Sequence, residues 1–360
     1  MKICIIGKGL TALILAKKLV ELGIKIDLID EKEIHFFSDS RTLAITEKNI
    51  EFLTSSFPNI TNKGCPVNEI KIYDERDRLN DLITFKKDKK VQFYMYEYNA
   101  ILDYVTQILK RDKRFKILKN KKNLFTKNFL EEYELIIDTS LKNSYSKKIF
   151  YKKVTKDYLS KAFVTIINHE SIKNNIARQI FTKYGPVAFL PISKNRTSIV
   201  FSIKNKENRN GIEIKNLINK YNNFYKIKSF KKIENFELKF SLMRKYYFKN
   251  ILAFGDALHR IHPLAGQGFN MNLRDIQNLL MLIKQNLEIG LPLNELILKK
   301  FENKMSYKNV IFATGIDFIY EFFMYENKLP NIISRKIFNI INNKKFLNIS
   351  KEIANRGISI

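Results

Sequence analysis

The sequence predicts an α/β fold: a Rossmann-like domain built on a parallel sheet, an inserted and mostly antiparallel β-sheet domain, and C-terminal helices. A glycine-bearing strand–helix–strand pattern opens the chain, β-rich segments fill its middle, and a helical pattern closes it. Strands that alternate with helices indicate a parallel sheet, whereas closely spaced strands joined by polar stretches indicate an antiparallel one.

The N-terminal unit is the clearest element. "KICIIG" is a short apolar run that ends in glycine, which is typical of a buried parallel strand. "LTALILAKKLVELG" has helical spacing and ends at Gly23, a residue type that commonly caps helices. "IKIDLIDE" is the second strand. Together they form a βαβ unit of about 30 residues.

The remaining elements follow in order. "EYNAILDYVTQILKR" predicts a helix and "YELIID" a strand that ends in an acid. Between Lys152 and Phe248, we expect "KAFVTIIN", "VAFLPI", "TSIVFSI" and "FELKFSL" to be strands of one largely antiparallel sheet. "NILAFGDA" returns to a buried strand, a long helix follows Gly268, and the chain after Asn309 is again helical. The predicted domains are residues 1–65, 96–148 and 248–325 for dinucleotide binding, 66–95 and 149–247 for the substrate, and 326–360 as a C-terminal helical segment.

Composition bounds the class of protein. The 360 residues carry a net charge of +28, yet the lysines are spread along the chain without zinc-finger spacing or an aromatic RNA-binding signature. We therefore expect no specific nucleic acid partner. Two cysteines, Cys4 and Cys65, cannot form a disulfide framework, which favours a reducing compartment. Because no uncharged apolar run reaches 18 residues, we expect a cytoplasmic protein without a spanning helix.

The first glycine cluster, "GKGLTA", fits the pattern G-x-G-x-x-A from Gly7 through Gly9 to Ala12. The first glycine permits a tight turn, the second lets a pyrophosphate approach the backbone, and the third small residue lets the helix pack close to the strand. The helix N-terminus then offers free N–H groups to the phosphates. Asp30, at the end of the second strand, is placed to accept a ribose hydroxyl.

The second glycine cluster is "GDALHRIHPLAGQGFNMNLRD", which holds three of only 12 glycines in the chain. It resembles the second FAD motif of flavin-dependent aromatic hydroxylases. The matching residues are Gly255, Asp256, Ala257, His262, Pro263, Gly266, Gln267, Gly268, Asn270 and Asp275. The resemblance implies that FAD spans both clusters, with its adenine end at Gly7–Asp30 and its flavin end at Gly255–Asn270.

The resemblance also implies individual roles. Asp256 accepts hydrogen bonds from the ribityl chain, and Gly266 and Gly268 let the backbone run flat against the flavin ring. A helix that begins near Asn270 points its N–H groups at the flavin edge, where reduced flavin is negatively charged. A metal held by His259 and His262 is the rival hypothesis, but three or four ligands are usually needed and no Cys or clustered acid completes the set.

Two further stretches narrow the family. "DSRTLAIT" and "FTKYGPVAFLPISKNRTSIVFSI" resemble segments of the UbiH-type ubiquinone-biosynthesis hydroxylases, and the resemblance places Arg41 against the flavin. It implies that a flavin C4a-hydroperoxide hydroxylates a polyprenylated phenol with O2. Pro263 and Gly266 then form the loop at the flavin face, and no side chain is assigned as acid or base.

One stretch departs from this family. Its usual D-G-x-x-S motif is here "DTSLKNS", Asp138 to Ser144, with Thr139 in place of the glycine. This departure leaves NAD(P)H in question as the electron source and points to a separate electron-donor protein. It also leaves open a flavoprotein that no longer hydroxylates and serves as a partner in a quinone-synthesis assembly, or a flavin-dependent prenyl reductase.

The net positive charge and "NIISRKIFNIINNKKFLNI", Asn331–Ile349, suggest a membrane surface. Apolar residues recur there at helical spacing among basic ones, as in helices that lie on anionic bilayers. A helix packed on the dinucleotide-binding domain explains the pattern equally well. On the first hypothesis the protein is peripheral on the inner face of the membrane.

Overall fold

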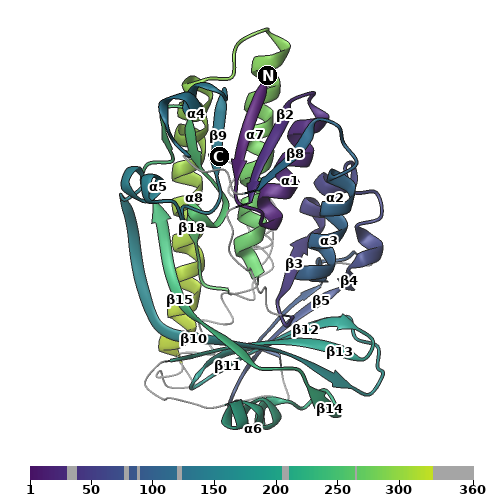
Figure 1. The fold of residues 1–360 in the computed structure, drawn as a ribbon. Coiled ribbons are helices and arrows are strands. Elements are labelled where there is room, and N and C mark those ends of the chain that lie inside the picture. Colours follow the sequence, from purple (N-terminus) through teal and green to yellow (C-terminus); the bar gives the residue numbers. More distant parts are fainter. Residues whose placement is uncertain are drawn as a thin grey trace.

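The computed structural model describes residues 1–30, 39–76, 81–86, 90–119, 124–204, 211–263 and 266–326. Within these ranges the chain forms three sheets. Figure 1 shows the six-stranded sheet and its helices above a nine-stranded sheet, which the long strands β10 and β15 connect to the upper part. The predicted α/β fold class, with a parallel sheet and a mostly antiparallel one, is confirmed.

The six-stranded sheet is the predicted parallel sheet. β1 pairs in parallel with β2 on one side and with β9 on the other, and α1 connects β1 to β2 as the βαβ pattern predicts. Only the short β16 runs antiparallel, beside β17. The strand order is β16–β17–β9–β1–β2–β8, with bounds β1 Lys2–Ile6, β2 Lys25–Asp30, β8 Phe115–Lys119, β9 Leu135–Asp138, β16 Tyr247–Phe248 and β17 Ile251–Ala253.

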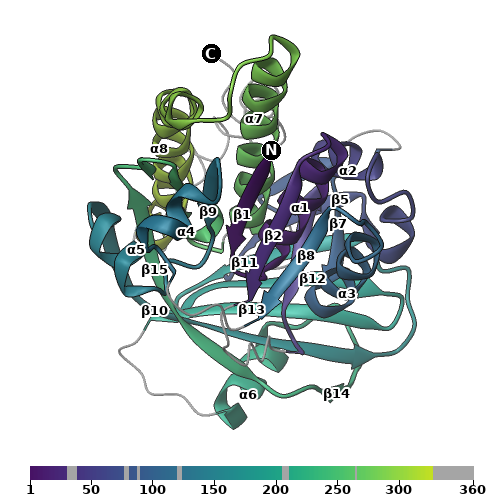
Figure 2. The same ribbon diagram turned by 45° about the horizontal axis from the view of Figure 1, so that its top comes forward.

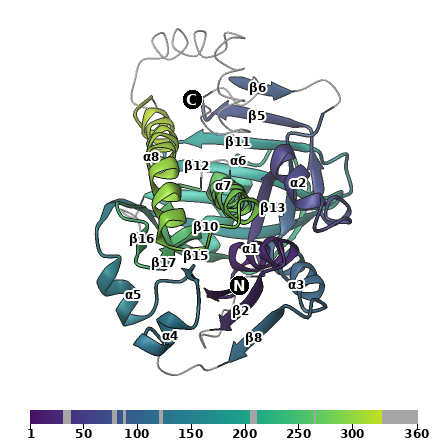
Figure 3. The same cartoon turned by 90° about the horizontal axis from the view of Figure 1, so that it is seen from above.

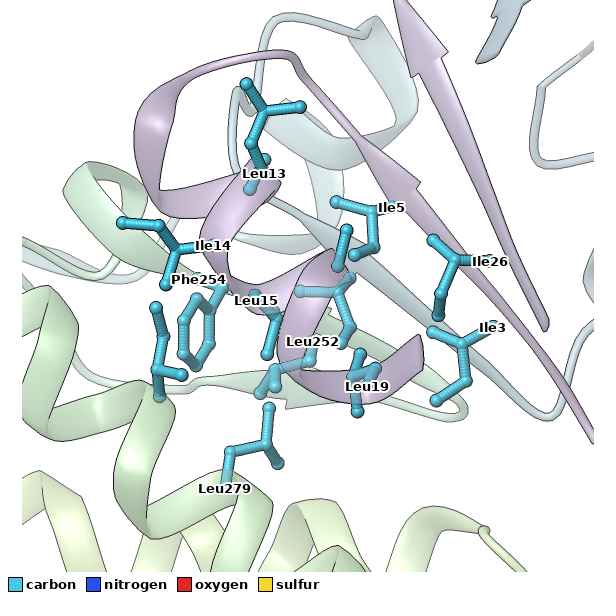
Figure 4. Packing of buried hydrophobic residues seen from close by; sticks show 14 of the residues in the cluster. Ile3, Ile5, Leu13, Ile14, Leu15, Leu19, Ile26, Leu252, Phe254 and Leu279 are labelled. Atoms are coloured by element: carbon cyan, nitrogen blue, oxygen red, sulfur yellow. The ribbon is translucent and has the colours of Figure 1, made fainter. Parts of the chain in front are cut away.

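Apolar packing fixes α1 (Leu10–Glu21) against this sheet and against α7 (Gln267–Glu288). Figure 4 shows Ile5 of β1, Leu15 of α1, Leu252 of β17 and Leu279 of α7 in one buried cluster. Each of these four side chains is fully buried, and burying one such side chain stabilises the fold by about 1.5–3 kcal/mol. The two helices are therefore held firmly relative to the strand ends, where the glycine clusters lie.

The nine-stranded sheet contains the four strands predicted between Lys152 and Phe248. All of its pairings are antiparallel except β5 with β11, and Figure 3 shows β5 and β6 at the edge beyond β11. Along the sheet the order is β18–β15–β10–β13–β12–β11–β5–β6, and β14 pairs with β10. The bounds are β5 Glu69–Asp74, β6 Ile83–Lys86, β10 Lys153–His169, β11 Ile176–Thr182, β12 Gly185–Ser193, β13 Arg196–Lys204, β14 Ile227–Phe230, β15 Glu234–Met243 and β18 His259–Arg260.

A small sheet and the remaining helices complete the fold. α7 and α8 run side by side, and α6 covers the far face of the nine-stranded sheet (Figures 1 and 2). The small sheet has the order β3–β7–β4. Its strands are β3 Thr42–Thr46, β4 Cys65–Val67 and β7 Phe93–Glu97; the other helices are α2 Glu47–Thr54, α3 Tyr98–Leu109, α4 Lys127–Glu131, α5 Ser144–Ile149, α6 Gly211–Tyr221 and α8 Glu295–Glu326, with 3-10 turns η1 Thr61–Lys63 and η2 Gly255–Ala257.

Two helices begin earlier than expected. α7 begins at Gln267 rather than near Asn270, because Gly266 adopts a left-handed conformation that turns the chain directly into the helix. α8 begins at Glu295, well before the expected start after Asn309. The domain boundaries stay a prediction: β5 and β6 join the nine-stranded sheet, whereas β4 and β7 pair with β3. The predicted segment 326–360 lies outside the described residues except for Glu326.

Candidate functional site

The first glycine cluster forms the turn between β1 and α1. Gly7 has φ +104°, and a Cβ at this position would collide with Thr139 Oγ1. Gly9 is the N-cap of α1 and supplies no side-chain cap, and a Cβ there would have only Tyr98 nearby, 3.9 Å from its hydroxyl. Ala12 is fully buried. The turn therefore needs glycine at its first position and leaves room for a ligand at its second.

Asp30 lies beside this turn. It is the last residue of β2, which pairs in register with β1. Its Oδ2 is 2.9 Å from Nζ of Lys8, the residue between the two glycines. The carboxylate is about a quarter exposed, so it can receive a ligand at the carboxyl end of the sheet.

The second glycine cluster touches the first. Gly255, at the start of η2, has φ +70°, and a Cβ there would lie 3.2 Å from Cγ2 of Thr11 in α1. From α7, Asn272 Nδ2 donates both to Asp256 Oδ1 (2.7 Å) and to Thr11 Oγ1 (3.2 Å). Asp256 itself is exposed. Two clusters about 250 residues apart in sequence thus line one site, with α1, η2 and α7 meeting at it.

Pro263 and Gly266 end the loop that leads into α7. The Gly266 N–H donates to the Pro263 carbonyl, and a Cβ on Gly266 would lie 2.9 Å from Cβ of Ala44 in β3. Gly268, in the first turn of α7, has more room, because a Cβ there would be 3.9 Å from Ile261. Gln267 is buried, and its Oε1 has no hydrogen-bond partner among the described residues. Since buried acceptors are normally satisfied, this one fits a ligand that donates a hydrogen bond.

Asn270 is engaged within the protein. Its Nδ2 donates to the carbonyl oxygens of Ala44 (2.8 Å) and Gly266 (3.1 Å), and its Oδ1 accepts from Thr46 N–H (3.0 Å) and Asn49 Nδ2 (2.9 Å). The side chain is fully buried. It therefore attaches the first turn of α7 to β3 and shapes the site from behind.

Arg41 connects to the first cluster through a residue that sequence reasoning missed, Tyr98. The Arg41 guanidinium lies 4.2 Å from the centre of the Tyr98 ring, and the Tyr98 hydroxyl accepts from the N–H of Leu10, the first residue of α1. Burial raises the pKa of Tyr98, and the positive charge of Arg41 opposes that rise. Nothing in the sequence singles out Tyr98, because it follows no motif and simply begins a helix.

The two histidines of the H-x-x-H pattern have different partners. His259 Nε2 lies 2.6 Å from Asp275 Oδ2, and both side chains are fully buried. His262 stacks on Tyr320 of α8, with 4.0 Å between ring centres, and burial lowers its pKa to about 3. In the described part of the chain, no group of three or more His, Cys, Asp or Glu residues is arranged to hold a metal ion. His259 instead attaches the segment before the loop to the helix after it.

The departing stretch after β9 forms a closed turn. Asp138 is fully buried, its Oδ1 accepts from the N–H groups of Ser140 and Leu141 (both 2.9 Å), and its Oδ2 accepts from Ser146 Oγ. Thr139 Oγ1 donates to the carbonyl of Ile6 at 2.8 Å. The Asp138 carboxylate is thus occupied with shaping its own loop.

The nine-stranded sheet turns one face toward this site. In β12, Phe189 packs with the cluster around α6, so its neighbours Ala188 and Leu190 point to the opposite face. On that face Leu190 packs against the apolar cluster that includes Ala44, the residue that Gly266 approaches. Gly266, at the start of α7, therefore lies close to this face of the sheet, where both Ala188 and Leu190 are only half-buried.

Comparison with known proteins gives this geometry a context. Residues 159–288 match the family of FAD binding domains. The ubiquinone biosynthesis monooxygenase COQ6 of Dictyostelium discoideum is 21% identical over 89% of this chain and 81% of its own length. The 3-demethoxyubiquinol 3-hydroxylase of Escherichia coli is 28% identical over 48% of this chain and 46% of its own length, so that match spans about half of each protein.

Solved structures share the fold. The probable FAD-dependent monooxygenase PqsL of Pseudomonas aeruginosa superposes with a TM-score of 0.75 at 14% identity, covering 95% of this chain and 99% of its own. The p-nitrophenol 4-monooxygenase PnpA of Pseudomonas putida gives 0.76 at 11% identity over 99% and 98%. The strand order and the contact between the two glycine clusters thus occur on a fold that such oxygenases also use.

Proposed function

Because the chain belongs to the UbiH-type family of FAD-dependent ubiquinone-biosynthesis hydroxylases, we propose that it hydroxylates the aromatic ring of a polyprenylated phenol. It is an FAD-dependent aromatic monooxygenase. The observation that carries the proposal is the contact of Thr11, Asp256 and Asn272, which brings both glycine clusters together and so supports a single dinucleotide site. The far end of this site, at Gly266, lies over the nine-stranded sheet.

The residues present fit FAD. Positive-φ glycines and the N-terminus of α1, where Gly9 supplies no side-chain cap, leave places for its phosphates. Gln267 Oε1, which has no hydrogen-bond partner among the described residues, leaves a place for its polar ring edge. When bound and reduced, FAD activates O2 for transfer of one oxygen atom to an electron-rich ring. We assign the adenosine and diphosphate end to Gly7, Gly9, Ala12 and Asp30, and the flavin end to Arg41, Asp256, Gly266, Gln267, Gly268 and Asn270, with Asn270 acting by fixing α7.

The phenol belongs between the sheet and the loop before α7. Ala188 and Leu190 supply a half-buried apolar floor, and Pro263 and Gly266 bound the space above it. A ring held there would be shielded from water and oriented toward the reacting face, which is what this chemistry asks of the protein. The prenyl tail, being longer than such a site, must leave along an apolar path to the surface.

The electrons come from a separate donor protein in this proposal. The resemblance associates the family's D-G motif with the pyridine nucleotide, but here Thr139 replaces the glycine, and the Asp138 oxygens accept hydrogen bonds from Ser140, Leu141 and Ser146. The Thr139 side chain further fills the space beside Gly7. This arrangement favours a protein donor over NADH or NADPH.

We propose that the protein acts at a membrane surface, bound to the cytoplasmic side. No helix among the residues that the structure describes is both long enough and apolar enough to cross a bilayer. The basic amphipathic stretch Asn331–Ile349, on which this proposal rests, lies outside the described residues. The protein should sediment with anionic but not with neutral liposomes, and high salt should release it; absence of binding to both would favour a helix that packs on the protein instead.

Neither a non-hydroxylating partner protein nor a prenyl reductase draws support from an observation of its own. Uptake of O2 that depends on the phenol separates hydroxylation from both. Cells lacking the protein should accumulate a quinone precursor one hydroxyl short.

Variants at one position of the site test this in the same cells. Gly268→Glu should fail to restore them because its side chain enters the flavin end, whereas Gly268→Ala should restore them because its Cβ makes only an ordinary contact with Ile261. Normal ubiquinone levels in the deletion strain, with no redundant hydroxylase present, would refute the proposal.

A further inference from the structure

Lys8 is a feature of the site that the general dinucleotide pattern does not require. It occupies the variable position between Gly7 and Gly9, where any residue fits the pattern. Its Nζ lies 2.9 Å from Asp30 Oδ2, and its side chain is 39% exposed, so the ammonium group is both paired and accessible. The strand pairing that brings the end of β2 beside the turn after β1 is what brings the two residues together.

The charges around the site explain why a cation belongs there. FAD bound as proposed would bring two negative phosphates to the N-terminus of α1, whose first turn contains no acid. Asp30 would add a further negative charge beside the ribose, and Asp256, which is linked through Asn272 to Thr11 of α1, adds another. Negative charges that lie close together weaken the binding of an anion unless a cation offsets them.

We propose that Lys8 is a FAD-binding residue, which neutralises Asp30 and attracts the diphosphate at the adenosine end of the site. The ion pair uses one carboxylate oxygen of Asp30, Oδ2, and within the described part of the chain the other is left for a ribose hydroxyl. The ammonium group has three N–H donors, of which the pair with Asp30 uses one. The positive charge of Lys8 therefore allows the Asp30 carboxylate, which binds the ribose, and the diphosphate to lie side by side.

The test measures the affinity of the apoprotein for FAD and for ADP, by fluorescence quenching and by calorimetry. Lys8→Gln should weaken both ligands by about tenfold, the order expected for losing one partly exposed charge. Lys8→Arg should stay within about twofold of the natural protein because it keeps the charge. The difference between Lys8→Gln and the natural protein should shrink at high salt, since salt screens exposed charges.

Lys17→Gln is the matched control. Lys17 lies in α1, the helix that follows Lys8, and pairs with Glu21 at 3.5 Å, but it is two helical turns away from the glycine turn. Its loss should leave both affinities unchanged. The inference fails if Lys8→Gln binds FAD and ADP as tightly as the natural protein, or more tightly, which would make Lys8 a competitor for Asp30.

The inference rests on the assignment of FAD as the cofactor, and the experiment separates the two. If the natural apoprotein binds neither FAD nor ADP, the cofactor assignment is wrong. If it binds both and Lys8→Gln does so equally well, only the role of Lys8 is wrong.

Discussion

Replacing Asn270 by alanine should destabilise the protein even when no cofactor is bound. The substitution removes the donor to the carbonyls of Ala44 and Gly266 and the acceptor for the N–H of Thr46 and for Asn49 Nδ2. Each buried polar group left without a partner costs about 1–3 kcal/mol. Because Ala44 and Thr46 are both buried, we expect a loss of about 3–5 kcal/mol in the free energy of unfolding.

Urea denaturation of the apoprotein measures this loss directly. Asn278→Ala is the matched control, because Asn278 lies on the same helix and, among the described residues, its side chain donates only to the carbonyl of Arg274. That change should cost less than about 1 kcal/mol. Asn270→Asp should fall between the two, since it keeps the acceptor and loses the donor. If Asn270→Ala unfolds like the natural apoprotein but no longer binds FAD, the residue contacts the cofactor and our account of it as scaffold is wrong.

Three other outcomes follow from the site. Gly9→Asp should abolish FAD binding while the isosteric Gly9→Asn retains part of it, because only the former places a charge beside the pyrophosphate; full FAD occupancy in Gly9→Asp would remove the cofactor assignment. Burial lowers the pKa of His262 from 6.5 to about 3. Between these two pH values the unfolded chain is protonated at His262 and the folded chain is not, so the free energy of unfolding should fall as the pH falls from 6.5 toward 3. Urea titrations should show that the loss of stability between neutral pH and pH 5 is about 2 kcal/mol smaller in His262→Phe than in the natural protein. The same pH dependence in both proteins would contradict this prediction. NADH or NADPH alone should reduce the bound flavin slowly or not at all, and rapid bleaching in stopped flow would show that the Asp138 turn does not exclude them.

The sequence was most informative where backbone geometry restricts the residue type. Gly7 and Gly266 have positive φ angles and close neighbours, so glycine is needed there and its spacing is visible in the sequence. The position of Asp30 at the end of a strand could be predicted because the apolar run before it marks the buried part of that strand. The parallel and antiparallel sheets likewise follow from local patterns of apolar residues.

Sequence reasoning failed where the role of a residue depends on distant contacts. Tyr98 lies at the site because it directly follows β7, which places its ring against the Arg41 guanidinium and its hydroxyl at the N–H of Leu10. No local sequence pattern predicts these contacts. The motif that includes Asn270 likewise gives no sign of the hydrogen bonds that its side chain makes to β3. α6 was missed because it lies between strands in a stretch rich in charge, and its apolar face becomes meaningful only against the sheet.

The most direct test of the central claim is a single turnover with isotope-labelled O2. The FAD-loaded protein would be reduced chemically without oxygen and then mixed with labelled O2 and a phenol that carries a short prenyl chain. We predict a ring product that contains one labelled oxygen atom, formed in proportion to the reduced flavin and detected by mass spectrometry. Reoxidation of the flavin with the phenol bound but unchanged, and with all of the label recovered as hydrogen peroxide or water, would contradict the proposed hydroxylation.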